Sequence, residues 1–181
     1  AKLTTVLGGH FFGGTKQIAG IIVANVDSGA SVTVRYLKVD GSSVTTKPTG
    51  ADYFAGIFYR ETGGVIDSVN MVAGGAWGGA DRGYGVYLSA VTNTVSVEVN
   101  ECTITNFDKN GIDAHGNKLT ANIHHNTITG RGLVADEVQN GVNIMDWAVG
   151  TVNYNTISNM ASTTAWTSAG ILFYHNGGTA N

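Results

Sequence analysis

The sequence is poor in charged side chains, proline and cysteine, and it contains no long apolar run. Charged residues make up 13% of the 181 residues, about half the usual share, and the formal net charge is −3. Lys and Arg do not cluster, so nucleic acid and anionic membranes are poor partners. The single cysteine, Cys102, excludes an intrachain disulfide framework. No segment approaches the roughly 18 apolar residues of a membrane helix.

Glycine is abundant, and a repeat is built on it. Of the 26 glycines, six open a segment that continues with a β-branched residue: Gly20, Gly56, Gly85, Gly111, Gly141 and Gly170. The intervals between them run from 26 to 36 residues, which is typical of a stacked repeat architecture. A second segment, with Asn-Thr-Ile as its common form, ends 16 to 19 residues after each of the first five glycines. No sustained 3.6-residue pattern is present, so we expect little helix.

Each repeat reads as strand, turn, strand and longer loop. Stacked units of this kind pair their strands in parallel at about 4.8 Å. Asn70, Asn126 and Asn155 recur at one bend, where amides can bond the next coil in a ladder. The pattern, from about Gln17 to Asn176, resembles the right-handed parallel β-helix of the pectate-lyase-like superfamily. The alternative is a β-sandwich or jelly roll.

We therefore predict an all-β parallel β-helix of five to six coils that forms a single domain over residues 1–181. Residues 1–16 would form an N-terminal cap and residues 17–176 the repeats. No C-terminal cap follows Tyr174, so the uncapped end predicts self-association into a homo-oligomer or a continuation of the chain.

The alternation of side chains along the first strand predicts an inner and an outer face. Positions one and three after each glycine are apolar and should face inward. Positions two and four should face outward: Ile22, Phe58, Tyr87, Asp113, Asn143 and Leu172, and Ala24, Arg60, Ser89, His115, Met145 and Tyr174. Neighbouring coils would bring these side chains within reach of one another, along a groove.

The outer face contains one pair suited to proton transfer. Asp113 beside His115 would raise the basicity of the imidazole and orient it as a general base. Arg60 would neutralise a substrate carboxylate, and Tyr87 or Tyr174 would exchange the second proton. These roles fit a lyase or epimerase that acts on a uronate-containing polysaccharide.

A narrower resemblance supports that chemistry. The segment Gly111-Ile112-Asp113-Ala114-His115 is similar to the Tyr-Gly-Phe-Asp-Pro-His stretch of the alginate C5-epimerases, which implies catalytic roles for Asp113 and His115. The sequence departs from the stretch at Asn110, where the family has Tyr, and at Ala114, where it has Pro. For substrate binding we expect the outward Asn143, Tyr174 and Phe58, and the loop residues Trp77 and Trp166, whose rings suit stacking on sugars.

Other functions remain open. The chain is alternatively a non-catalytic structural, adhesive or carbohydrate-binding module of a larger secreted protein, or a glycoside hydrolase that uses Asp113 and Asp146. No metal or other cofactor is required, although Asp136, Glu137 and Asp146 offer oxygen ligands for calcium. A polysaccharide partner would place the protein outside the cell or at the cell surface.

Overall fold

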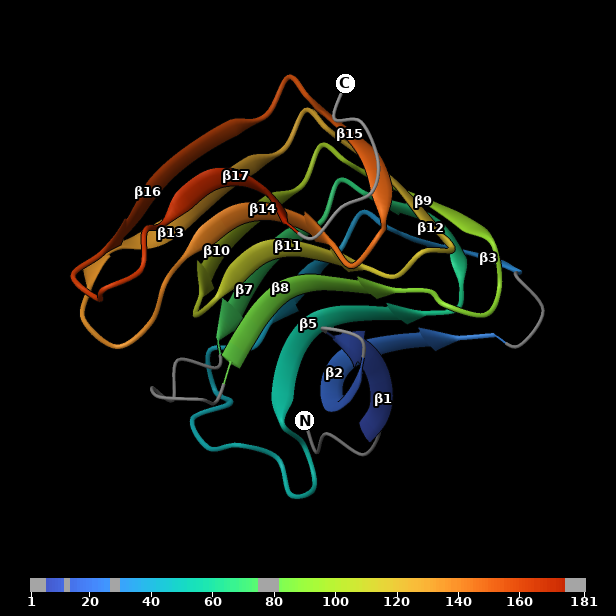
Figure 1. Cartoon of the computed structure of the whole chain (residues 1–181), viewed down its shortest axis with the longest axis horizontal. Helices are drawn as coiled ribbons and strands as arrows, with labels where there is room; N and C mark the ends of the chain where they lie inside the picture. The colour runs from blue at the N-terminus through green and yellow to red at the C-terminus, as the bar shows by residue number, and fades with distance from the viewer. Residues whose placement is uncertain (1–5, 12–13, 27–29, 75–81, 175–181) are drawn as a thin grey trace.

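The computed structural model describes residues 6–11, 14–26, 30–74 and 82–174. This part of the chain forms 17 β-strands and no helix, and so none that could cross a membrane. The strands lie in one seven-stranded and two five-stranded sheets, which wind into a stack of five coils (Figure 1). All neighbouring strands are parallel except β1 and β2. The predicted parallel β-helix is confirmed.

Each of the five coils contributes one strand to each sheet, and sheet A also contains β1 and β17. Sheet A contains, in spatial order, β1 (Val6–Phe11), β2 (Gly14–Asn25), β5 (Tyr53–Arg60), β8 (Arg82–Ser89), β11 (Asn110–His115), β14 (Asn140–Met145) and β17 (Ala169–Tyr174). Sheet B contains β3 (Ser31–Arg35), β6 (Gly63–Asp67), β9 (Val95–Asn100), β12 (Leu119–His124) and β15 (Val149–Asn153). Sheet C contains β4 (Lys38–Asp40), β7 (Asn70–Gly74), β10 (Thr103–Phe107), β13 (Thr127–Val134) and β16 (Thr156–Ser162).

The inward columns hold the core, as predicted, from β5 to β14. The side chains one and three positions after each marker glycine belong to a single buried cluster: Ile57, Tyr59, Val86, Leu88, Ile112, Ala114, Val142 and Ile144. The glycine column has a steric cause. A Cβ on Gly111 would lie 2.6 Å from Ile128 Cγ2 and 2.7 Å from the carbonyl oxygen of Gly141. Sheet C and the next coil therefore occupy the space that a side chain would need.

The first coil departs from the predicted register by one residue. Gly20 pairs with Ala55 rather than with Gly56, and Ile22 and Ala24 consequently face the interior. Val23 takes the outward position beside Phe58. The prediction that Ile22 and Ala24 point outward is wrong. Gly20 and Gly56 lie 36 residues apart, but each residue of β2 pairs with the residue of β5 that lies 35 positions later, so the alternation shifts by one residue.

A ladder of polar side chains lines the turn between sheets B and C. Asn126 Oδ1 accepts a hydrogen bond from the Cys102 amide at 2.9 Å, and its Nδ2 donates to the carbonyl of Val99 at 2.9 Å. Asn155 Oδ1 in turn accepts a hydrogen bond from the backbone amide of Asn126 at 2.9 Å. This confirms the predicted ladder for Asn126 and Asn155. Asn70 is not part of it, because Asn70 pairs with Thr103 and the ladder column contains Val69 instead.

Replacing Asn126 by Ala is expected to lower the free energy of unfolding by about 2–4 kcal/mol, since two buried backbone groups lose their partners. The matched control is Asn122→Ala in the same coil, where a half-buried amide accepts one hydrogen bond from Thr151. The control should cost about 1 kcal/mol or less. Urea unfolding measures both variants, and equal losses would contradict the structural role of the ladder.

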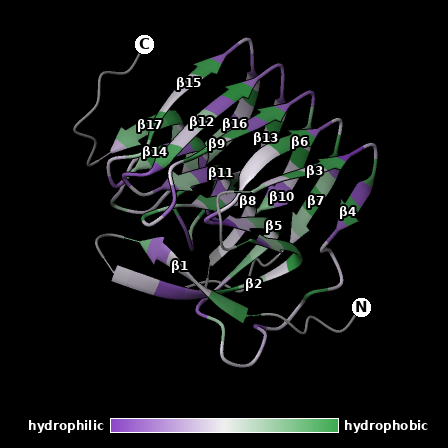
Figure 2. Ribbon diagram, turned by 90° about the vertical axis from the view of Figure 1, so that its right-hand side faces the viewer, coloured by the Kyte–Doolittle hydropathy of each residue, from purple (hydrophilic) through white to green (hydrophobic). Residues whose placement is uncertain are grey.

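The N-terminal strand folds over the outer face of sheet A. β1 pairs antiparallel with β2 and then lies against β5 and β8 (Figures 1 and 2). Arg60 Nε donates to the carbonyl of Gly8 at 2.7 Å, the His10 amide donates to Ser89 Oγ at 2.8 Å, and the Tyr87 hydroxyl donates to the carbonyl of His10 at 2.7 Å. The segment thus closes the free edge of β2 and also covers the face that was expected to be an open groove.

Candidate functional site

A pocket of about 480 Å³ opens on the outer face of sheet A, at the end farther from β2. Phe11, the last residue of β1, lies on one side of it, and the loop that carries Trp166 lies on another. The remaining lining residues are Lys109, Asn110, Glu137, Val138, Asn140, Asn143, Met145, Thr167, Leu172 and Tyr174. The volume falls within the range of small-ligand pockets, about 300–1,000 Å³.

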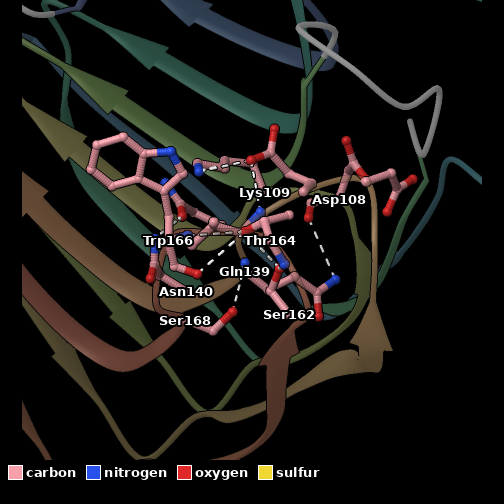
Figure 3. A network of polar contacts seen from close by, with 12 residues as sticks. Asp108, Lys109, Gln139, Asn140, Ser162, Thr164, Trp166 and Ser168 are labelled. Carbon is pink, nitrogen blue, oxygen red and sulfur yellow. Dashed lines mark hydrogen bonds and ion pairs between the residues drawn. The ribbon is translucent and has the colours of Figure 1, made fainter.

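Amide side chains fix the wall of the pocket to the coils beneath it. Asn140 Nδ2 donates a hydrogen bond to Asn110 Oδ1 at 2.9 Å, and Asn140 Oδ1 accepts one from the backbone amide of Ala169 at 3.1 Å. The backbone amide of Gln139 donates a hydrogen bond to Ser168 Oγ at 3.2 Å. These bonds hold the loop before β17, and the Trp166 side chain stands at the margin of the network (Figure 3). Trp166 is 77% exposed, so its ring is free to contact a ligand.

The charged groups beside the pocket are largely paired with one another. Lys109 Nζ lies 2.9 Å from Glu137 Oε1, and Arg131 lies 2.5 Å from Asp108 Oδ1 and 3.4 Å from Asp136. Burial raises the pKa of Asp108 to about 7, against the lowering effect of Arg131. A carboxyl with a raised pKa near a second carboxylate is a feature of glycoside hydrolases. Asp108, however, is fully buried and does not line the pocket, which argues against that role.

Asn143 connects the pocket to a buried ionic cluster. Its Nδ2 donates to Asp113 Oδ1 at 2.7 Å, and the side chain is only 4% exposed. Its Oδ1 has no hydrogen-bond partner among the described residues. Buried amide oxygens are rarely left in this state, because the lost hydration costs about 1–3 kcal/mol. Although Asn143 lines the pocket, this oxygen itself lies beneath the pocket surface and is not accessible to a ligand.

The imidazole of His115 lies between two carboxylates. Its Nε2 is 2.9 Å from Asp113 Oδ2 and its Nδ1 is 3.1 Å from Asp146 Oδ2. Burial opposes the charged form, but the two carboxylates outweigh it and raise the pKa of His115 to about 9. At neutral pH the ring is therefore protonated, and it has no lone pair with which to abstract a proton.

β1 shields this cluster from solvent. His115 is fully buried and stacks on Tyr87, with ring centroids 5.0 Å apart, while Phe11 lies 5.3 Å away on centroids. His10 Nε2 lies 3.8 Å from Asp146 Oδ2. Burial lowers the pKa of His10 and the charge on His115 lowers it further, against the raising effect of Asp146. His10 therefore covers the cluster mainly as a neutral side chain.

The four predicted catalytic residues are covered by β1 or bound to it. Asp113, His115 and Tyr87 are fully buried under β1, so the prediction that they line an open groove is wrong. Burial, followed by the charge on Asp113, raises the pKa of Tyr87 well above its usual value. Arg60 holds β1 and bonds Asn25 Oδ1 at 2.9 Å. The catalytic role of these residues stays a prediction.

Of the predicted substrate-binding residues, three come together in the pocket: Asn143, Trp166 and Tyr174. Phe58 does not join them, because it is buried beneath β1 beside Tyr87. Trp77 lies outside the described residues. The sequence did not predict that Lys109, Glu137 and the amide pair Asn110 and Asn140 line a pocket, and Glu137 was considered only as a calcium ligand. The signal for the amide pair was present, since an Asn precedes the marker glycine in two successive coils.

The carboxylates considered for calcium face cations instead. Glu137 faces Lys109, Asp136 faces Arg131, and Asp146 faces His115. Across the described ranges no group of three or more His, Cys, Asp or Glu side chains is placed to hold a metal ion. An oxygen cage needs carboxylates that converge on one point, and these do not fit that requirement.

Comparisons of the chain with protein-family models, with curated proteins and with solved structures found no match. The assignment of a parallel β-helix therefore rests on the structure itself. The resemblance to polysaccharide-active families has no support from a related protein.

Proposed function

We propose that this protein is a non-catalytic carbohydrate-binding β-helix module that holds a neutral saccharide over β11, β14 and β17. The observation that carries the proposal is the composition of the pocket, in which the exposed ring of Trp166 lies beside amide side chains. Saccharide hydroxyls both donate and accept hydrogen bonds, and so do side-chain amides.

The other lining residues match the two surfaces of a sugar. Trp166 and Tyr174 offer aromatic faces for the apolar side of a pyranose ring. Asn110, Asn140 and Thr167 add polar groups for its hydroxyls. Aromatic rings together with a few placed amides are the usual composition of a small-molecule pocket.

The charge distribution favours a neutral ligand over a uronate. Lys109 is the only lining residue with a positive charge, and its ammonium is already paired with Glu137. Arg60, the predicted partner of a substrate carboxylate, is bound to the backbone of β1. A uronate carboxylate in the pocket would therefore lose its hydration without gaining an unpaired cation.

The same geometry weighs against proton abstraction. His115 is charged at neutral pH, has a carboxylate at each ring nitrogen, and is covered by β1. The lyase or epimerase hypothesis would require β1 to leave and His115 to lose its proton. Incubation with alginate and pectate tests it: absorbance of unsaturated uronate would reveal a lyase, and NMR of the product would reveal an epimerase. We expect neither signal.

Trp166→Ala is expected to weaken the affinity for a neutral oligosaccharide roughly tenfold, or about 1.4 kcal/mol, because the stacking surface is removed. The ligand is first selected by screening neutral and uronate oligosaccharides on an array. Affinities are then measured by isothermal titration calorimetry. Trp147→Ala is the matched control, since Trp147 is 58% exposed and does not line the pocket.

The control should bind like the unaltered protein. Equal losses in both variants, or binding restricted to uronates, would contradict the assignment of the pocket. Absence of binding to every oligosaccharide on the array would remove the carbohydrate proposal altogether.

A further inference from the structure

The C-terminal end of the β-helix presents three unpaired strand edges. β17, β16 and β15 are each the last strand of their sheet, so one side of each backbone has no strand partner among the described residues. The interior columns also open at this end. Ile171 is 45% exposed and Phe173 is 36% exposed, whereas their paired equivalents Val142 and Ile144 are 0% exposed.

The two ends of the stack differ in charge. The edge strands at the N-terminal end, β3 and β4, carry Arg35, Lys38 and Asp40. From Trp147 to Tyr174, by contrast, the sequence contains no Asp, Glu, Lys, Arg or Pro. Charges and prolines are the usual devices that keep exposed edges from pairing with other strands. The C-terminal edge has none of them, which favours its pairing with another β-structure.

The N-terminal end cannot accept that edge in sheet A. β1 already occupies the free side of β2 through six paired positions. Head-to-tail stacking of one molecule on the next is therefore blocked there, and an open filament is not the expected outcome. The matching edge on a second copy is the same C-terminal edge, and a face without charges meets itself without repulsion.

From these observations we propose that a second copy of this chain docks on the C-terminal end in a closed two-fold dimer. β17 of one copy pairs antiparallel with β17 of the other, which makes sheet A continuous between the two molecules. Ile171 and Phe173 become buried against their counterparts. Leu172 and Tyr174 keep their outward position, so the two pockets lie on one shared face.

Sedimentation velocity and light scattering of the 181-residue chain test the proposal. The expected mass is twice the 18.8 kDa of one chain. Ile171→Lys should yield monomers, because two ammonium groups would meet across the two-fold axis. Leu133→Lys, at a residue that is 71% exposed on β13, should leave the dimer intact. A monomer at every concentration, a filament, or a dimer insensitive to Ile171→Lys would overturn the proposal.

Cross-linking provides a measurement that does not depend on the stability of the lysine variant. Cysteines introduced one at a time by Leu172→Cys and Tyr174→Cys lie on β17, and the native Cys102 is buried and does not interfere. At least one of the two should form a disulfide-linked dimer on mild oxidation. Tyr36→Cys, exposed at the other end, should not. Cross-linking of Tyr36→Cys alone would place the interface elsewhere and overturn the proposal.

Discussion

Ile112→Asp is expected to abolish cooperative folding of this protein. Ile112 is fully buried in the fourth of the five coils, and it pairs with Val86 on one side and Val142 on the other. An unpaired carboxylate there would face an apolar interior with no cation nearby. The cost is of the same order as the whole stability of a domain, about 5–15 kcal/mol. Circular dichroism during heating should show no cooperative transition.

The matched control for this prediction is Thr127→Asp. Thr127 belongs to the same coil, but its side chain is exposed on the outer face of sheet C. The substitution should change the free energy of unfolding by about 0.5 kcal/mol or less. A cooperative melt of Ile112→Asp at the original temperature would mean that the inward column is assigned to the wrong face.

The inward columns could be predicted because the constraint repeats in every coil. Each side chain in a column stacks on its equivalent about 4.8 Å away, so the same apolar type recurs at the same place. Gly85, Gly111 and Gly141 mark the register, since the next coil leaves no room for a side chain. The inward and outward positions of the first coil were predicted wrongly because its glycine interval includes one additional residue. Gly20 therefore pairs with Ala55 instead of Gly56.

The turns between sheets B and C could not be predicted in the same way. In each coil one residue there has a positive φ, and Ser68, Glu101 and His125 have values of 52°, 50° and 55°. Glycine and asparagine are the residues that usually signal this conformation. Because neither occupies these positions, the sequence contained no turn signal, and only the stacking of coils reveals the column.

The cover over the candidate catalytic face was also invisible in the sequence. The segment before Gly14 has no place in the repeat, so no column predicts where it lies. Its contacts are remote in sequence: His10 bonds residues 77 and 79 positions away. The pocket was more accessible to prediction, because Asn143 and Tyr174 stand in outward columns. Trp166 was placed beside them by the position of its loop before the next strand.

His115→Gln is expected to lower the free energy of unfolding by about 3–5 kcal/mol near pH 6. The amide of Gln keeps hydrogen-bonding groups but removes the positive charge between Asp113 and Asp146. Two carboxylates would then share a buried site without the cation that now separates them. The stacking contact that His115 makes with Tyr87 is lost as well. Urea unfolding at a series of pH values measures the difference between the variant and the unaltered protein.

That difference should shrink as the pH rises. The pKa of His115 is raised from 6.5 to about 9 in the folded protein, so its stabilising effect is fully present below about pH 6.5. It is lost progressively up to about pH 9, and the shift corresponds to about 3 kcal/mol. Asp108, whose pKa is raised to about 7, titrates in both proteins and cancels in the comparison.

Two further variants establish whether the charge is responsible. Adding Asp113→Asn to His115→Gln removes one carboxylate and should recover part of the lost stability. His124→Gln alters a partly exposed histidine bonded to Glu98, and it should cost about 1 kcal/mol or less. A His115→Gln variant with unchanged stability at every pH would mean that the ring is not held as a cation. Its use as a general base, and with it the lyase or epimerase hypothesis, would then regain its physical basis.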